Sequence, residues 1–161
     1  MRSEQETVDA IERYADTVKR LCAVHLANRS DTDDIFQTVF LKYALSETSF
    51  ENTEHEKAWL IRVTINACKD VARASSRRRS VPLDEVAEIA ADAPEDHRDV
   101  LEAVLALPDK YRNVVYLHFY EGYTAPEIAS LIGKNPNTVY TLLTRSKKLL
   151  RKKLGGGEHE A

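Results

Sequence analysis

A stretch near the end of the chain, residues 124–154, is predicted to form two helices joined by a tight turn. Gly133 is expected to end the first helix, because glycine readily adopts the left-handed conformation of a helix C-cap. Pro136 cannot extend that helix, and Asn137 or Thr138 is expected to cap the second one. The pattern therefore predicts a helical hairpin with a glycine in its turn.

Three residues around this turn have the spacing of a helix-turn-helix. Ala129 precedes Gly133 by four positions, where a small side chain lets two helices cross closely. Val139 follows Gly133 by six positions, where an apolar side chain holds the second helix against the first. Any helical hairpin of a bundle would satisfy the same apolar pattern. However, every charged residue in the range 134–154 is positive, whereas a merely solvated face usually mixes signs. The unit is therefore predicted to bind DNA.

The composition favours an all-helical chain. Its 161 residues are 43% hydrophobic and 30% charged, and its five glycines and five prolines fall between periodic segments. Such a chain suits one domain or two small ones. The net charge is only −3, but the charges are segregated along the chain, and local fields matter more than their sum.

The cysteines and histidines do not indicate a metal site. Cys22 and Cys68 are far apart in the sequence and show no CxxC pairing, so we expect two buried, small hydrophobic residues in a reducing compartment. No histidine forms a pair at ligand spacing with either cysteine, and no cofactor is predicted. There is no signal peptide and no apolar run long enough to span a bilayer, so a cytoplasmic location is expected.

Two helices are predicted to open the chain. The first spans about residues 4–28 and has one broad apolar stripe. The second spans about residues 32–44, where Ser30 or Asp31 can cap it. It shows two apolar faces rather than one, which indicates either a partner-binding surface or a fully packed central helix. Phe50 then stands alone in a polar stretch and is expected to plug the neighbouring core.

The third helix is long, over about residues 54–79, and carries polar residues along one face. They recur at steps of three or four: Asn66, Lys69 or Asp70, Arg73 and Arg77. A polar side chain that can read a base edge, followed by arginines on the same face, suits nucleic acid. A solvated basic helix end, which complements the helix dipole, explains the pattern equally well.

Residues 80–99 differ in composition from both flanks, since they are rich in acidic residues. We expect an acidic linker between two domains, with a weak helix around residues 84–91. Short helices are predicted over residues 100–107 and 111–120, before the helix-turn-helix. Residues 155–161 are expected to form a flexible tail.

Four separated motifs, in this order, resemble those of the extracytoplasmic-function sigma factors, the small group of the bacterial sigma-70 family. They are Asp33–Phe40 (acidic-apolar-Gln-x-x-Phe), Ala58–Asp70 (a WLxxIxxN…D helix), Leu107–Arg112 with Leu117 and Tyr120 (LPxxxRxVxxLxxxxG), and Glu127–Ala129 with Thr138–Val139. The resemblance covers about residues 4–154. It implies an all-α chain with a sigma-2-like helical bundle in residues 1–79, an acidic linker in 80–99 and a sigma-4-like helix-turn-helix domain in 100–154.

The resemblance also implies a role for each part. The second helix would dock on the clamp helices of RNA polymerase through Asp34, Gln37, Phe40 and Leu41. The promoter's −10 element, held as a single strand, would contact Phe50, Asn66, Lys69, Arg73, Arg77 and Arg78. Capturing a flipped base costs a few kcal/mol of unstacking, which a snug pocket and phosphate contacts offset. The −35 element would be read in the major groove by Asn137, Thr138, Tyr140, Thr141, Thr144, Arg145 and Lys148.

Two positions depart from the family pattern. Many members carry basic residues where this chain has Tyr140 and Leu142. Leu142 can pack against the first helix of the motif, as a helix-turn-helix allows. Tyr140 removes one expected cation, so the −35 sequence does not transfer from the family to this chain.

The implied function is that of an alternative sigma factor, which binds core RNA polymerase, directs it to promoters through both elements and initiates transcription in the cytoplasm, at the nucleoid. An anti-sigma partner is common in the family. The competing hypothesis is a stand-alone regulator that binds DNA as a dimer, which leaves the basic third helix unexplained. An enzyme is not indicated, because the sequence shows no glycine-rich phosphate loop, no metal-ligand cluster and no nucleophile-base spacing.

The acidic linker prompts one hypothesis. It either folds over the basic surfaces of the free protein or threads a basic channel in polymerase. Screening of the free protein would involve the linker acids Asp84, Glu85, Glu88 and Asp92.

Overall fold

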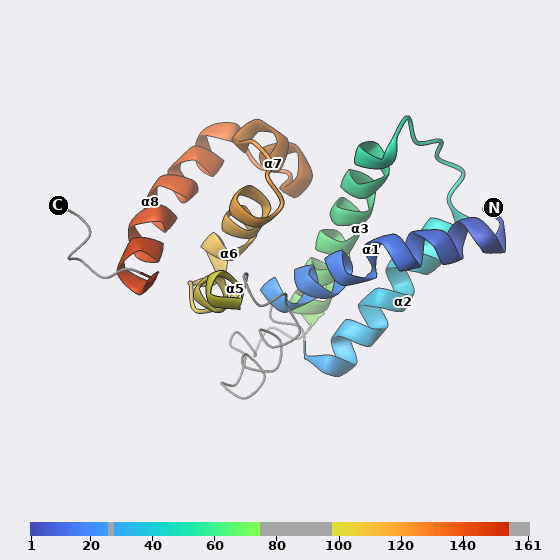
Figure 1. Ribbon diagram of the computed structural model, residues 1–161, viewed down its shortest axis with the longest axis horizontal. Coiled ribbons are helices and arrows are strands. Elements are labelled where there is room, and N and C mark those ends of the chain that lie inside the picture. Colours follow the sequence, from blue (N-terminus) through green and yellow to red (C-terminus); the bar gives the residue numbers. More distant parts are fainter. Residues whose placement is uncertain (26–27, 75–97, 155–161) are drawn as a thin grey trace. The chain divides into compact units, whose positions relative to one another are not determined.

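The computed structural model describes residues 1–25, 28–74 and 98–154, and these residues form helices and loops without a strand (Figure 1). The predicted all-α class is confirmed. The chain divides into two compact units, Met1–Arg79 and Ser80–Ala161. The weak helix expected around residues 84–91, most of the acidic linker and the C-terminal tail lie outside the described residues.

Three helices build the first unit: α1 (Glu4–Val24), α2 (Arg29–Leu45) and α3 (Thr53–Ala74). Each packs against the other two, as the blue, light blue and green ribbons of Figure 1 show. α1 begins with a capping box, in which the Ser3 hydroxyl accepts from the Glu6 amide and the Glu6 carboxylate accepts from the Ser3 amide.

The start of α2 corrects a prediction. The cap is Asn28, whose side-chain oxygen accepts from the Asp31 amide at 2.8 Å, and neither Ser30 nor Asp31 holds that position. Asparagine caps helices as well as serine or aspartate does, so capping strength alone does not distinguish position 28 from positions 30 and 31. The earlier start adds most of a turn to the helix.

The core of the first unit is apolar and is shared by all three helices. Its members include Tyr14, Val18 and Cys22 from α1, Val39, Phe40 and Tyr43 from α2, and Leu60 and Cys68 from α3. Phe50, from the loop between α2 and α3, packs against this cluster and confirms the expectation that it plugs the core. One apolar face of α2 is therefore fully packed.

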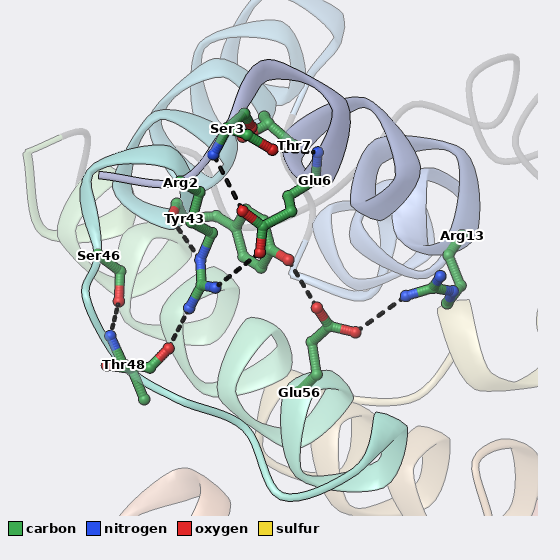
Figure 2. Close-up of polar contacts among 9 residues, drawn as sticks. All are labelled: Arg2, Ser3, Glu6, Thr7, Arg13, Tyr43, Ser46, Thr48 and Glu56. Carbon is green, nitrogen blue, oxygen red and sulfur yellow. Dashed lines mark hydrogen bonds and ion pairs between the residues drawn. The ribbon is translucent and has the colours of Figure 1, made fainter.

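A buried carboxylate joins the same three helices. Glu56 of α3 is only 8% exposed, and it accepts hydrogen bonds from Arg13 of α1 at 3.0 Å and from Tyr43 of α2 at 2.6 Å (Figure 2). It also accepts from the Tyr14 hydroxyl of α1 at 3.0 Å. Both carboxylate oxygens thus have donors, which offsets the cost of removing the charge from water. Burial, followed by the hydrogen bond to Glu56, raises the pKa of Tyr43 to about 12.

The two cysteines meet in this core. Cys22 of α1 and Cys68 of α3 are 0% and 3% exposed, and both are free thiols. Their hydrogen bond and their burial raise the pKa of the Cys68 thiol. Burial agrees with the expectation from the sequence, but the contact between the two side chains does not follow from their 46-residue separation.

The second unit contains α5 (Arg98–Leu105), α6 (Asp109–Val115), a π-helical turn (Tyr116–Tyr120), α7 (Ala125–Ile132) and α8 (Pro136–Leu154). The single helix predicted over residues 111–120 is thus an α-helix that widens into a π-helical turn. α8 packs against α5, α6 and α7, so the last helix lies across the others of its unit.

Arg112 holds the turn between α5 and α6. Its guanidinium is buried and donates to the carbonyls of Leu105 at 3.3 Å and Leu107 at 2.7 Å. Carbonyls at the end of a helix lack intrahelical donors, so this arginine satisfies groups that α5 leaves open. Its burial lowers the pKa of Arg112.

Candidate nucleic-acid interface

The hairpin of α7 and α8 is built as its sequence predicts. Gly133 has φ 72° and ψ 37°, which is the left-handed conformation expected at the end of α7. The amide of Lys134 then donates to the carbonyl of Ala129 at 3.0 Å and closes the turn. At its other end, α7 begins with a capping box between Thr124 and Glu127.

The cap predicted for α8 is wrong by two or three residues. α8 begins at Pro136, and the Asn135 side chain accepts from the Asn137 amide at 2.8 Å. Proline suits the first helical position, because it has no amide hydrogen that needs a partner and its φ is already helical. Asn137 and Thr138 therefore lie inside the first turn of α8.

The packing between α7 and α8 confirms the role of the small and apolar positions. Ala129 is 4% exposed, Val139 is completely buried, and Ile128 and Ile132 complete the inner side of α7. Leu142 is half-buried, in keeping with the expectation that it packs inward. This packing fixes which face of α8 remains outside.

All seven residues predicted to contact the −35 element are exposed: Asn137, Thr138, Tyr140, Thr141, Thr144, Arg145 and Lys148. Tyr140 is the one large aromatic residue among them, and 54% of it is exposed. The Thr141 hydroxyl donates to the Asn137 carbonyl at 3.1 Å, so its proton is engaged within the helix. The sequence of α8 contains no acidic residue, which makes this face electropositive.

The predicted −10 residues lie along one side of α3. Asn66 and Arg73 are exposed, Lys69 is half-buried, and Arg77 and Arg78 lie outside the described residues. At 100° per residue, Asn66 and Arg73 fall within about 40° of Trp59 around the helix, roughly 10 and 20 Å further along it. The Arg73 guanidinium pairs with Asp70 at 2.8 Å, so part of its charge is locally compensated.

Phe50 lies at the start of this side of α3, within a group of rings. Its ring stacks on Tyr43 with centroids 6.1 Å apart, and it meets His55 and Trp59 edge-on at 5.3 and 5.8 Å. The ring is partly buried, so only part of it faces outward. The contacts with His55 and Trp59 place Phe50, in the loop before α3, against the first turns of that helix, on the side where Asn66 and Arg73 follow.

One of the four polymerase-docking residues is corrected. Asp34, Gln37 and Leu41 are exposed on one side of α2, but Phe40 is 4% exposed and packs in the core, with its ring 4.8 Å from that of Phe36. Phe40 follows the Asp34 side by about 120° around the helix, which turns it inward. It therefore supports α2 from within.

Leu45 is an exposed residue that the sequence analysis missed. It follows Leu41 by one turn, and the two leucines are 57% and 60% exposed, large values for such side chains. The predicted helix stopped at residue 44. Extending the i, i+4 pattern by one residue would have found Leu45.

A second missed residue is Arg2, which lies between the start of α1 and the loop after α2 (Figure 2). It borders an open cavity of about 590 Å³, together with Tyr43, Thr48, Phe50 and Glu56. No local pattern in the sequence identifies such a residue, because the carbonyls that its guanidinium binds are more than 40 positions away. Within the described residues, no helix has the length and apolarity needed to span a membrane, and no cluster of potential metal ligands occurs.

Two family models match the chain in the order of its two units. The model described as Sigma-70 region 2 matches residues 10–78, and the model described as Sigma-70, region 4 matches residues 97–150. The first match contains α2 and α3, and the second contains the helix-turn-helix of α7 and α8.

Whole-chain comparisons give the same result. The chain is 32% identical to the RNA polymerase sigma factor SigV of Bacillus subtilis over 158 residues, which cover 94% of this chain and 95% of SigV. It is 30% identical to the ECF RNA polymerase sigma factor SigW of the same organism, over 91% of this chain and 87% of SigW. A solved structure of CnrH in complex with the cytosolic domain of CnrY has the same fold, with a TM-score of 0.65, 21% identity and coverage of 96% of this chain and 91% of that one. The chain therefore belongs to the extracytoplasmic-function sigma factors of the sigma-70 family.

Proposed function

We propose that this sigma factor recognises promoters with two surfaces, one in each unit, while it is bound to core RNA polymerase. The observation that carries the proposal is that both sigma-70 regions match in one chain, one over the basic side of α3 and the other over an exposed, acid-free face of α8. Residues 1–79 would dock and bind the −10 element, residues 100–154 would bind the −35 element, and residues 80–99 would link them.

The −35 surface is the outward face of α8. A helix held by α7 at a fixed angle fits the major groove, where arginine recognises guanine with two hydrogen bonds. Arg145 suits that role, and Lys148 suits a phosphate. Tyr140 would contribute its exposed ring to sugar or thymine methyl contacts rather than a charge.

The −10 surface comprises the loop that carries Phe50 and the polar side of α3. Stacking of an unpaired base on an aromatic ring tolerates every base, whereas an amide such as that of Asn66 adds base-edge selectivity. Lys69 and Arg73 would hold phosphates further along the strand, followed by Arg77 and Arg78.

The docking surface is the exposed side of α2. Asp34 and Gln37 supply polar contacts, and Leu41 with Leu45 supplies the apolar area that a protein interface needs near its centre. Phe40 would contribute only by keeping α2 in place. Docking on polymerase would set the spacing of the two DNA surfaces, so that binding at one raises the effective concentration at the other.

Binding rather than catalysis accounts for all of these surfaces, so we assign no enzymatic reaction to the chain. Its site of action would be the cytoplasm, at the nucleoid. A further partner would be an anti-sigma factor, as the resemblance to the family implies. The solved CnrH structure, which shares this fold, is a complex with the cytosolic domain of CnrY.

Run-off transcription tests the proposal. Bacterial core polymerase and the full chain are incubated with a promoter library randomised at both elements, and the transcribed templates are sequenced. We expect two enriched elements at a fixed spacing. Random enrichment, or no transcript above that of core polymerase alone, would refute the proposal.

A pull-down with core polymerase, together with gel filtration of the free chain, tests the competing role of a dimeric regulator. We expect retention by polymerase. A chain that forms a symmetric dimer on a palindrome and is not retained by polymerase would favour the regulator instead.

A further inference from the structure

Arg2 is held between the C-terminal end of α2 and the loop that follows it. Its side chain is only 12% exposed, although it lies next to the first residue of the chain. The guanidinium donates to the carbonyl of Tyr43 at 3.1 Å and to the carbonyl of Thr48 (Figure 2). The backbone amide of Arg2 donates to the carbonyl of Ala44 at 2.8 Å. A weaker ion pair with Glu6, at 3.9 Å, links the guanidinium to α1.

These bonds satisfy groups that a helix end leaves open. The carbonyls of Tyr43 and Ala44 belong to the last turn of α2, where the regular intrahelical bonds run out. The Tyr43 carbonyl also accepts from the amide of the C-cap residue Ser46 at 3.2 Å, and Ala44 accepts from the Arg2 amide. A cation is also favoured at that end by the helix dipole. The same guanidinium also donates to the Thr48 carbonyl in the loop, so one side chain joins the end of α2 to the loop.

The same guanidinium lies over two aromatic rings. Its central carbon is 4.5 Å from the centroid of the Tyr43 ring and 4.7 Å from that of Phe50. Arginine stacks favourably on aromatic faces, more so when it is removed from water. Arg2 therefore contacts both the backbone of the loop and the ring that the loop contributes to the proposed −10 surface.

The loop has few other restraints between its two ends. Within it, the Thr48 amide donates to the Ser46 hydroxyl at 3.0 Å, while the residues 47–49 are exposed. Asn52 belongs to the far end, where it caps α3 through the His55 amide at 2.8 Å. Arg2 thus tethers the exposed middle of the loop, residues 47–49, next to the packed ring of Phe50. A segment ordered before binding loses less entropy when a strand binds to it.

We propose that Arg2 is a positioning residue for promoter opening, which holds the loop of residues 46–52 and the Phe50 ring in the arrangement that accepts the −10 strand. The inference rests on the proposed function of this loop. It concerns a residue outside the range 10–78 that matches the region 2 family model, so it is a property of this chain that the match does not imply.

The test compares Arg2→Gln and Arg2→Lys with the wild type. Lysine keeps the charge but lacks the planar fork that reaches two carbonyls at once. Lys19→Ala is the matched control, because it removes an exposed cation from α1 without touching the loop. Circular dichroism of each full-length variant verifies that the helices are retained.

Two measurements follow. Hydrogen exchange mass spectrometry of the free proteins reports the order of residues 46–50. Holoenzyme affinity is then measured for a forked template that carries the selected −10 sequence as a single strand, and for the same template with one abasic −10 position.

For both Arg2 variants we expect faster exchange in the loop, unchanged exchange in the core of α1 to α3, and unchanged affinity for core polymerase. Affinity for the intact fork should fall by about tenfold, the effect of losing one or two hydrogen bonds. The preference for the intact over the abasic fork should also decrease, which a general loss of stability would not cause.

Three results would overturn the positioning role. They are unchanged hydrogen exchange in the loop, wild-type affinity for the fork in both variants, or wild-type affinity for the fork in Arg2→Lys alone, which would mean that the charge suffices. In each case the wild-type holoenzyme still binds the fork, and the proposed function stands. A wild-type holoenzyme that ignores the −10 strand would instead refute the proposed function itself.

Discussion

The hydroxyl of Tyr43 on α2 donates a 2.6 Å hydrogen bond to the carboxylate of Glu56 on α3, and the same carboxylate accepts from Arg13 and Tyr14 on α1. One buried acid therefore connects every helix of the first unit. Removing it would leave the buried Tyr43 hydroxyl without this acceptor, and an unpaired buried donor costs more than the bond it replaced was worth. Tyr14 would keep its 3.2 Å bond to the Thr53 carbonyl, and the half-exposed Arg13 would turn to water.

Glu56→Ala is accordingly expected to destabilise the first unit by about 3 to 5 kcal/mol. Glu56→Gln keeps one acceptor oxygen, but its amide group faces a donor. A destabilisation of about 2 kcal/mol is expected. Urea unfolding followed by the fluorescence of Trp59, the single tryptophan, reports this unit. Glu54→Gln, an exposed change on the same helix, should alter stability by less than about 0.5 kcal/mol.

The raised pKa of Tyr43 predicts a stability that falls in alkali. Its value in the folded state is about 12, against an ordinary value of 10.0, so the folded protein keeps a proton that the unfolded chain releases. The stabilisation is complete below pH 10 and is lost as the pH rises through 12, at up to about 1.4 kcal/mol per pH unit.

Tyr43→Phe should reduce the loss of stability per pH unit between pH 10 and 12, as measured by unfolding at a series of pH values. Part of the loss should remain, because the pKa of Tyr14 is also raised. The variant should be less stable at neutral pH, because Glu56 loses a donor. Parallel curves for the two proteins above pH 10 would contradict the assignment of the slope to Tyr43.

The turn of the helix-turn-helix should be sensitive at two positions. Gly133→Ala is expected to cost about 1 kcal/mol, because alanine is strained at φ 72°, although an added Cβ meets no atom within 4 Å. Asn135→Ala should cost about 1 kcal/mol through loss of the α8 cap. Hydrogen exchange of α7 and α8 measures both. Asn137→Ala should have a much smaller effect, and an equal effect would restore Asn137 as the cap.

On the −35 surface, two cationic residues should behave differently. Arg145→Ala is expected to relax the preference for one base pair at a cost of about 1 to 3 kcal/mol, because a bidentate contact to guanine is lost. Lys148→Ala should weaken all sequences alike and reduce the slope of log affinity against log salt by about one. Holoenzyme binding to duplex promoters in a salt series separates the two effects. Lys147→Ala is the matched control, since its side chain leaves α8 100° away from that of Lys148.

The docking surface gives a prediction about partners rather than stability. Replacing Leu41 and Leu45 by glutamate should lower the affinity for core polymerase by at least about tenfold, because charged residues are depleted at interface centres. Both side chains are more than half exposed, so thermal unfolding of the free protein should change little. A pull-down with core polymerase measures the affinity. Retention equal to that of the wild type would remove these leucines from the interface.

Local rules predicted the second unit well, because its decisive features lie within a few residues of one another. Ala129, Gly133 and Val139 set the hairpin through steric and conformational effects that need no distant partner. The errors at helix starts, one in each unit, were local too. Asn28 in the first unit and Asn135 in the second cap helices that were predicted to start two or three residues later, since several residues of similar capping strength stand close together.

The site in the first unit was predicted less completely, and the reason is distance along the chain. Phe40 and Leu45 both suit an apolar face, and only the packing of α1 and α3 decides that Phe40 is buried while Leu45 is exposed. Glu56 and Arg2 satisfy groups about 40 residues away, which no helical periodicity encodes. The shared face of Asn66, Lys69 and Arg73 on α3, in contrast, follows from their spacing, while Arg77 lies outside the described residues.

The contact between Cys22 and Cys68 lets thiol alkylation report how often the first unit unfolds locally. Both thiols are closed to reagents in the folded state, and a thiol reagent attacks the thiolate, which the raised pKa of Cys68 disfavours. Since the sequence contains no other cysteine, the rate of alkylation measures how often the first unit opens, without any engineered label. The same measurement on the holoenzyme would show whether polymerase slows that opening. The second unit would not contribute to the signal, because it contains no cysteine.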